Sequence, residues 1–213
     1  MQFQEAYSKY YDLLNQAKPY KKEIEFIYKW ACKPETIFDI GAGTASYWKY
    51  YPKNTILFGI DKSEDMVKQS CGRVSWLDIT LGTLPWPPFD CATALFDVMN
   101  YIPLHDWWRN IPLKSGGYFI FDLWHKEKVD AEGFKTTIKR IEDVTRIVKP
   151  LGYDGKKVRL EVWIGCGKKE HTEIHEMYVY SFDDIKRFCG KDFEIVDTRP
   201  GKNWQMWMKL RRL

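Results

Sequence analysis

The sequence predicts an α/β protein in which a mostly parallel sheet carries helices on both faces. A short apolar run at residues 36–40 is bounded by glycines, which is typical of a buried strand. A sharp turn at Gly41 and Gly43 follows it. A second apolar run, at residues 56–60, then ends in Asp61, about twenty residues after the glycines, as in the nucleotide folds of this class.

The glycine turn can hold a nucleotide. The residues beside the turn distinguish between two kinds of nucleotide ligand. Gly41 and Gly43 leave the backbone open to a ligand, and we expect a helix after them whose free N–H groups point at that ligand. A dinucleotide site would need a third glycine where the chain has Ser46, and the Asp39 carboxylate would repel a pyrophosphate. S-adenosylmethionine (SAM) carries a sulfonium, an ammonium and no phosphate, which suits Asp39. A turn that binds no nucleotide is the remaining alternative.

The residues from Asp39 to Ala45, DIGAGTA, resemble the first motif of the class I SAM-dependent methyltransferases, D/E-x-G-x-G-x-G, with alanine in place of the third glycine. The resemblance implies a Rossmann-like, seven-stranded, mostly parallel sheet with a reversed last hairpin, SAM as the cofactor and S-adenosylhomocysteine as the product. It implies that Asp61 binds two ribose hydroxyls and that Asp78 receives the adenine amino group, although Asp78 could equally cap the next turn. The cofactor contacts that it implies are Tyr11, Lys18, Tyr20, Asp39, Gly41, Ala42, Gly43, Asp61, Lys62, Met66, Leu77, Asp78, Ile79, Phe96 and Met99.

Residues 1–19 are predicted to form an N-terminal lid helix. Aromatic and apolar side chains recur every three or four residues there, until Pro19 breaks the pattern. Tyr11, Lys18 and Tyr20 are similar to the lid that precedes the core in small-molecule N-methyltransferases of the amino-sugar kind, where such residues close over the methionine end of SAM. The tyrosines could equally be packing residues.

Two later strands, at residues 89–96 and 113–125, are expected to bring polar side chains to the same site. Ligands of open α/β sheets bind outside the carboxyl ends of the strands. The polar and aromatic residues that follow or end these two strands are Asp97, Asn100, Tyr101, Trp124 and His125.

These strand-end residues supply the predicted chemistry. We expect Asn100, Tyr101, Trp124 and His125 to contact the substrate. The candidate catalytic residues are His125, Asp97 and Tyr11, of which His125 or Asp97 would take a proton from the acceptor. His125 could equally be a surface residue that caps the strand.

Residues 134–180 are predicted to form an antiparallel sheet inserted after the fifth strand, because apolar and charged side chains alternate between turns. Small-molecule methyltransferases often carry an insertion at this point, so the resemblance implies a lid over the substrate. The charged side chains could equally form a solvated outer face. His171 and His175 are four residues apart on a predicted strand, too far apart to share a metal without more ligands, and we assign no metal.

Length and composition favour a single domain over residues 1–213, with 45% hydrophobic residues to form its core. Five cysteines without a C-x-x-C pair, no signal peptide and no membrane-spanning run predict a cytoplasmic protein that is not bound to a membrane. The net charge of +4 is well mixed and does not indicate nucleic acid. A homodimer is compatible with the sequence.

The predicted function is transfer of a methyl group from SAM to a nitrogen or oxygen of a small-molecule acceptor. Two alternatives share the fold: an RNA or protein methyltransferase, and a catalytically silent SAM-binding protein. The chain has neither an N-P-P-Y-like tetrapeptide after the fourth strand nor a Pro-Cys pair. These absences favour the small molecule.

Overall fold

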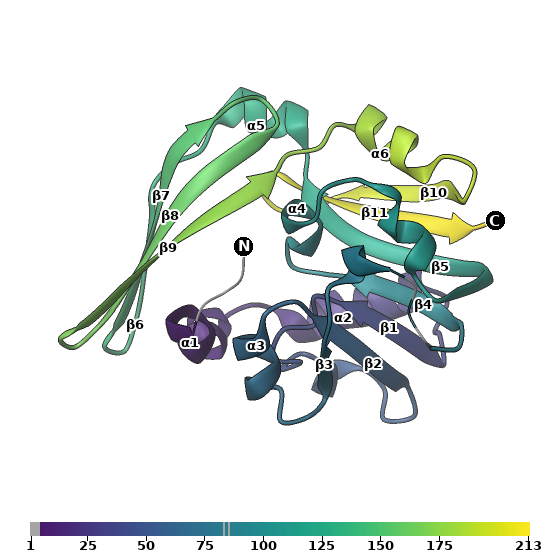
Figure 1. The fold of residues 1–213 in the computed structure, drawn as a ribbon, viewed down its shortest axis with the longest axis horizontal. Helices are drawn as coiled ribbons and strands as arrows, with labels where there is room; N and C mark the ends of the chain where they lie inside the picture. The colour runs from purple at the N-terminus through teal and green to yellow at the C-terminus, as the bar shows by residue number, and fades with distance from the viewer. Residues whose placement is uncertain (1–4, 83, 85) are drawn as a thin grey trace.

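The computed structural model describes residues 5–82, 84 and 86–213, so residues 1–4 of the predicted lid lie outside it. In this described part, seven strands form one sheet in the order β10-β11-β5-β4-β1-β2-β3 (Figure 1). The strands from β1 to β5 are parallel, and β11 is antiparallel to both β5 and β10. The strands are β1 (Thr36–Ile40), β2 (Ile56–Asp61), β3 (Val74–Trp76), β4 (Phe89–Ala94), β5 (Leu113–Trp124), β10 (Phe193–Pro200) and β11 (Gln205–Arg212). The predicted fold class, with its reversed last hairpin, is confirmed.

The register of the central strands places the glycine turn beside the end of β2. Asp39 of β1 lies opposite Gly59 of β2 and Thr93 of β4. Because the three strands are parallel, their carboxyl ends meet at one edge of the sheet. Gly41 and Asp61 therefore lie side by side at this edge.

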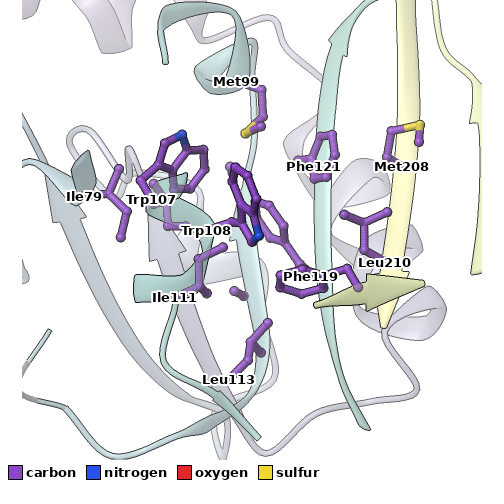
Figure 2. Packing of buried hydrophobic residues seen from close by; sticks show 14 of the residues in the cluster. Ile79, Met99, Trp107, Trp108, Ile111, Leu113, Phe119, Phe121, Met208 and Leu210 are labelled. Carbon is purple, nitrogen blue, oxygen red and sulfur yellow. The ribbon is translucent and has the colours of Figure 1, made fainter. Parts of the chain in front are cut away.

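Alternate side chains of the sheet pack into a hydrophobic core on each face. Ile37 packs with α2 (Tyr20–Trp30) on one face, and Phe38 belongs to the core that includes α6 (Phe182–Cys189) on the other. Figure 2 shows part of this second core, where the labelled side chains are Ile79, Met99, Trp107, Trp108, Ile111, Leu113, Phe119, Phe121, Met208 and Leu210. Helices on both faces agree with the predicted fold.

Two helices begin at serine residues whose side chains cap them. The Ser63 hydroxyl accepts a hydrogen bond from the backbone N–H of Met66 at the start of α3 (Glu64–Gln69). Ser181 and Asp184 form a reciprocal capping box at the start of α6. The remaining helical segments are α1 (Glu5–Asn15), α4 (Val98–Tyr101), α5 (Lys126–Glu132) and the 3₁₀ turns Trp48–Tyr50, Ile79–Leu81 and Asp106–Asn110.

The predicted helix directly after the glycine turn is wrong. Between β1 and β2, all of whose residues are described, the chain forms only the 3₁₀ turn Trp48–Tyr50. Ala45 has a φ of 54°, in the left-handed region that a right-handed helix excludes. The side chains of Tyr47 and Trp48 also turn back to hydrogen-bond Asp39. A ligand at the turn therefore meets individual backbone N–H groups and does not meet the N-terminus of a helix.

A second sheet follows β5 in the chain, as predicted. Its strands are β6 (Thr137–Ile141), β7 (Val144–Tyr153), β8 (Lys157–Cys166) and β9 (Lys169–Tyr178), all antiparallel to their neighbours. Figure 1 shows this sheet standing to one side of the central sheet, with α1 near it. Tyr7 and Leu14 of α1 pack on Val144, Val162 and Ile164. The helix and the second sheet therefore share a small core of their own.

Candidate active site

The glycine turn is held in place by Asp61 at the end of β2. One carboxylate oxygen of Asp61 accepts a hydrogen bond from the backbone N–H of Gly43 at 2.8 Å, and the other accepts one from Ser63 at 2.7 Å. Gly41 has a φ of +68°, and a Cβ there would lie 2.5 Å from Val98. The turn therefore presents bare backbone beside a carboxylate whose pKa is raised by burial.

Two cavities lie along this edge and share part of their walls. The larger, of about 210 Å³, extends over the ends of β2 and β3, and the smaller, of about 50 Å³, lies between the glycine turn and α1. The shared wall consists of Gly41, Asp61, Val98 and Tyr101. Among the predicted cofactor contacts, the larger cavity also has Lys62, Leu77, Asp78 and Ile79, and the smaller has Tyr11, Ala42, Gly43, Met66 and Phe96.

The larger cavity combines apolar walls with the carboxylate of Asp78, in addition to that of Asp61. Leu77 and Ile79 flank Asp78, whose carboxylate lies 2.6 Å from the Lys62 ammonium and accepts the Thr80 backbone N–H at 3.0 Å. Burial alone would raise the pKa of Asp78, but the hydrogen bonds from Lys62 and Thr80 outweigh it and lower the pKa. Asp78 thus caps the following turn and also lines the cavity.

Lys18 and Tyr20 line neither cavity themselves, but they contact Tyr47 and Phe96, which line the smaller one. The Tyr20 ring stacks on Tyr47 at 5.9 Å and meets Phe96 edge-on at 5.1 Å, while the Lys18 ammonium lies 4.8 Å from the centre of the Phe96 ring. The Tyr20 hydroxyl is buried and has no hydrogen-bond partner within the described part of the chain. A cation beside an unpaired O–H donor suits a carboxylate ligand.

Asp39 lies beneath the glycine turn and lines neither cavity. Its carboxylate accepts hydrogen bonds from the Tyr47 hydroxyl at 2.6 Å, the Trp48 indole at 2.6 Å and the Thr93 hydroxyl at 2.7 Å. Burial raises its pKa to about 6 in spite of these bonds. Met99 is also outside both cavities, since it belongs to the hydrophobic core (Figure 2). Asp39 and Met99 therefore line neither cavity, and their direct contact with the cofactor stays a prediction.

The carboxyl end of β4 is strained and is held by β5. Phe96 and Asp97 have φ values of 65° and 67°, which are costly for residues other than glycine. The Asp122 carboxylate accepts the backbone N–H groups of Phe96 at 2.7 Å and of Asp97 at 3.0 Å, and burial with the nearby Asp97 charge raises its pKa to about 7. Asp97 in turn accepts the Trp124 indole N–H at 2.9 Å. The structure thus brings Asp97 and Trp124 together, and burial also raises the pKa of Asp97.

Asn100 braces the site from within the core, and its predicted contact with the substrate stays a prediction. Its side chain is fully buried. The amide nitrogen donates to the backbone oxygen of Tyr178 at 2.6 Å, and the amide oxygen accepts the Trp124 backbone N–H at 3.2 Å. Both ends of the amide are therefore used to tie α4 to β5 and β9.

His125 follows the last residue of β5 and is the N-cap residue of α5, and its predicted place in the crevice stays a prediction. Successive side chains of a strand lie on opposite faces. Asp122 and Trp124 face Phe96 and Asp97, whereas Leu123 lies in the core on the other face. His125 lies beyond the end of β5, and its Nδ1 lies 2.6 Å from the Glu127 carboxylate.

Comparisons with known proteins identify the fold. No protein-family model matches the sequence, and no curated protein is significantly similar to it. A SAM-dependent methyltransferase from Clostridium acetobutylicum superposes with a TM-score of 0.78 at 21% identity, over 95% of this chain and 96% of that one. DesVI from Streptomyces venezuelae gives 0.81 at 16% identity, over 100% of both chains. CalS10, a SAM-bound amino pentose methyltransferase from Micromonospora echinaspora involved in calicheamicin biosynthesis, gives 0.76 at 16% identity, over 100% and 98%.

The chain has the SAM-dependent methyltransferase fold. In this methyltransferase fold the two cavities lie outside the carboxyl ends of the parallel strands, the place where open α/β sheets bind ligands. The sequence also predicts a ligand site at this edge of the sheet, because Gly41, Asp61 and Asp78 each follow an apolar run.

The methyltransferase fold also carries a cluster that sequence reasoning missed. The Tyr101 hydroxyl lies 2.8 Å from Nδ1 of His175 on β9, and Nε2 of His175 lies 3.2 Å from the Glu173 carboxylate. Burial, followed by the charges of Tyr7 and Asp97, raises the pKa of Tyr101 well above its ordinary value, so its hydroxyl stays protonated.

A signal for this cluster was present in the sequence. His171, Glu173 and His175 alternate along one strand and therefore share a face, and only a metal had been considered for the two histidines. Among the described residues, no group of three or more His, Cys, Asp or Glu side chains is placed to hold a metal ion. Within the same residues, no helix has the length and apolarity needed to cross a membrane.

Proposed function

We propose that this chain is a methyltransferase that transfers a methyl group from SAM to a nitrogen or oxygen of a small-molecule acceptor. The observation that carries the proposal is the pair of cavities that meet at Gly41, Asp61, Val98 and Tyr101. CalS10, which has the same fold, is a SAM-bound amino pentose methyltransferase, and this likeness supports a small amine as the acceptor.

The residues around the two cavities fit the parts of SAM. Asp61 has a lone pair left on each oxygen after accepting from Gly43 and Ser63, and these lone pairs can accept the ribose hydroxyls. Asp78, between apolar Leu77 and Ile79, offers an acceptor for the adenine amino group.

The methionine end of SAM suits the other cavity. Lys18 and the unpaired Tyr20 hydroxyl match a carboxylate, and Tyr11 lies in the wall that α1 contributes. The bare backbone at Gly43 leaves space for the connecting chain, since nothing lies within 4 Å of where its Cβ would be.

The chain's part in the reaction is to position the acceptor and exclude water. When bound, SAM supplies an electrophilic methyl group on a sulfonium, which is already a good leaving group. Tyr101 borders both cavities, and Tyr11 of α1 lines the smaller one, so α1 and the second sheet packed against it would cover a ligand on that side. A roofed site holds the acceptor against the methyl group and removes its hydration shell, which are the two main contributions available for such a displacement.

We further propose a cytoplasmic location, supported by the five free cysteines. Reduced thiols persist in that compartment, whereas an oxidising one favours disulfides. Reaction of the exposed thiols of Cys32 and Cys71 with a thiol reagent in fresh lysate would test this placement.

Titration calorimetry of the purified protein tests the cofactor assignment. We expect SAM and S-adenosylhomocysteine to bind with dissociation constants on the order of micromolar. NAD serves as the matched control, because it contains the same adenosine and adds a pyrophosphate. Heat from NAD but from neither SAM nor S-adenosylhomocysteine would refute the assignment.

A transfer assay then tests the acceptor class. The protein is incubated with methyl-labelled SAM and, separately, with pooled small amines and alcohols, pooled RNA and pooled protein. Label in the small-molecule pool is the expected result. Label only in RNA or protein would overturn the proposed acceptor while leaving the SAM site intact.

A further inference from the structure

A buried hydrogen-bond chain leads from the shared cavity wall into the second sheet. Tyr101 lines both cavities, and its hydroxyl lies 2.8 Å from Nδ1 of His175. Nε2 of the same ring lies 3.2 Å from a carboxylate oxygen of Glu173. His175 and Glu173 are each only 3% exposed. This hydrogen-bond chain therefore connects the cavity to a carboxylate that bulk water does not reach.

The stability of the second sheet does not by itself explain the hydrogen bonds that link Tyr101, His175 and Glu173. In the β8–β9 ladder, Glu173 lies opposite Val162 and His175 opposite Leu160, and both partners are buried apolar residues. Burying a carboxylate is costly even when it is paired, and apolar side chains at these two positions would extend the existing core. Glu173 and His175 are polar residues on an apolar face, and their hydrogen bonds lead to a cavity. A role in that cavity explains them better.

We assign the proton of His175 to Nε2, because a carboxylate accepts hydrogen bonds and Glu173 then pairs with an N–H at Nε2. Nδ1 is then the acceptor for the Tyr101 hydroxyl. A carboxylate that fixes a histidine in this way also stabilises the imidazolium that forms when Nδ1 gains a proton.

We propose that Tyr101 takes the proton released by the methyl acceptor and passes its own proton to His175, which Glu173 holds in the required tautomer. This inference rests on the proposed function. Tyr101 is the catalytic residue, because it lines the cavities, and His175 and Glu173 are positioning residues that act through it.

The step balances in atoms and charge. The lone pair of the acceptor nitrogen or oxygen bonds to the methyl carbon as the methyl–sulfur bond breaks, and the electrons of that bond stay on sulfur. The acceptor proton moves to the Tyr101 oxygen while the Tyr101 proton moves to Nδ1 of His175. The positive charge of the sulfonium is thereby replaced by an imidazolium charge beside Glu173, and the proton leaves by the reverse path with product release.

Nitrogen NMR tests the tautomer without any acceptor. The chain has four histidines, so the signals of His175 in protein labelled at the imidazole nitrogens are assigned by their loss in His175→Gln. We expect a neutral ring with the proton on Nε2 near pH 7. A ring protonated on Nδ1 would overturn the proposal, because Tyr101 could then not donate to it.

Kinetics test the role in turnover, with the acceptor found by the transfer assay. We expect Tyr101→Phe and His175→Gln to lower kcat about 10- to 1000-fold, as loss of a general base does, while the Kd for SAM changes less than about twofold. Glu173→Gln keeps the shape of the side chain but removes its charge, and it should lower kcat by a smaller factor.

His171→Gln is the matched control. His171 lies on the same face of β9, and its Nε2 is 3.5 Å from the other oxygen of Glu173, on the side away from the Tyr101–His175 bond. We expect its kcat to stay within about twofold of the wild type. A merely structural role of His175 would shift the melting temperature of His175→Gln and leave its kcat equal to that of His171→Gln, and this result would overturn the proposal.

The two proposals fail in different ways. If the wild-type protein does not bind SAM, the proposed function is wrong, whatever the tautomer of His175. If SAM binds and the acceptor is methylated at the wild-type rate by Tyr101→Phe, only the proton path is wrong.

Discussion

The backbone N–H of Gly43 donates to the carboxylate of Asp61 at 2.8 Å, so the residue proposed to bind the ribose also holds the glycine turn in place. Asp61→Ala removes this bond, the bond from Ser63 and both acceptors for the ribose. We expect the affinity for SAM to fall by about 1–3 kcal/mol and the free energy of unfolding without ligand to fall by about 1–2 kcal/mol. Calorimetry measures the first quantity and urea denaturation the second.

The control for this prediction is Glu64→Ala. Glu64 is an exposed carboxylate on α3 that pairs with Lys68 at 3.1 Å. Such surface pairs contribute little to stability, so neither quantity should change by more than about 0.5 kcal/mol. An unchanged Kd for SAM in folded Asp61→Ala would place the ribose elsewhere.

Gly41→Ala and Gly43→Ala separate backbone strain from steric clash. Both glycines have positive φ, so each alanine adds strain of about 1 kcal/mol. Only the Cβ at position 41 would strike Val98, at 2.5 Å, and we expect this clash to cost about 1–3 kcal/mol more. Urea denaturation of both variants gives the difference. Adding Val98→Ala should recover stability in the Gly41→Ala chain and lower it in the Gly43→Ala chain; equal effects in both would contradict the steric argument.

The parts of the fold that could be predicted from the sequence are those with local signals. Apolar runs bounded by glycine and followed by an acid indicate a parallel strand and its functional end, which is why Gly41, Asp61 and Asp78 were expected at one edge. The alternation in residues 134–180 likewise predicted the second sheet.

The parts that could not be predicted depend on tertiary packing. His125 follows Trp124 by a single position, but β5 ends at Trp124 and His125 is the N-cap residue of α5, so the strand pattern does not place its side chain. The contact of Tyr101 with His175 joins segments 74 positions apart, and it forms only when the second sheet folds back over α4. The missing helix after the turn follows from the left-handed Ala45, a position at which the related motif has glycine.

The second sheet contains two facing cations that lower its stability. Lys139 of β6 lies directly opposite Arg146 of β7, and the pKa of Lys139 is lowered by burial and by the charge of Arg146. Like charges in facing positions are destabilising. We expect Lys139→Glu to increase the free energy of unfolding by about 0.5 kcal/mol, as measured by urea denaturation at low salt.

A loss of stability is expected when an attractive pair of facing charges in the same sheet is made repulsive. Lys149 of β7 lies opposite Glu161 of β8, so Lys149→Glu turns an attractive pair into a repulsive one. We expect a loss of about 0.5 kcal/mol there, and both effects should shrink as salt is added. A gain or a loss in both variants would mean that facing charges do not control the stability of this sheet.

Asp39 should make the stability of the protein depend on pH between about 4 and 6. Its pKa is about 6 in the folded chain against 3.8 for the free group, so the folded state binds this proton more tightly than the unfolded state does. Below pH 3.8 both states are protonated and the burial cost is absent; as pH rises through 6 the cost develops fully, to about 3 kcal/mol.

Asp39→Asn isolates this contribution, because asparagine does not titrate. The variant exchanges one acceptor for a donor and loses hydrogen bonds to Tyr47, Trp48 or Thr93, but that loss is the same at every pH. Asp122, whose pKa is raised to about 7, titrates in both proteins and cancels in the comparison. We therefore expect the stability of the variant relative to the wild type to improve by up to about 3 kcal/mol from pH 4 to pH 7, measured by urea denaturation at each pH. Parallel stability curves would mean that Asp39 keeps an ordinary pKa, and that its three hydrogen bonds offset its burial completely.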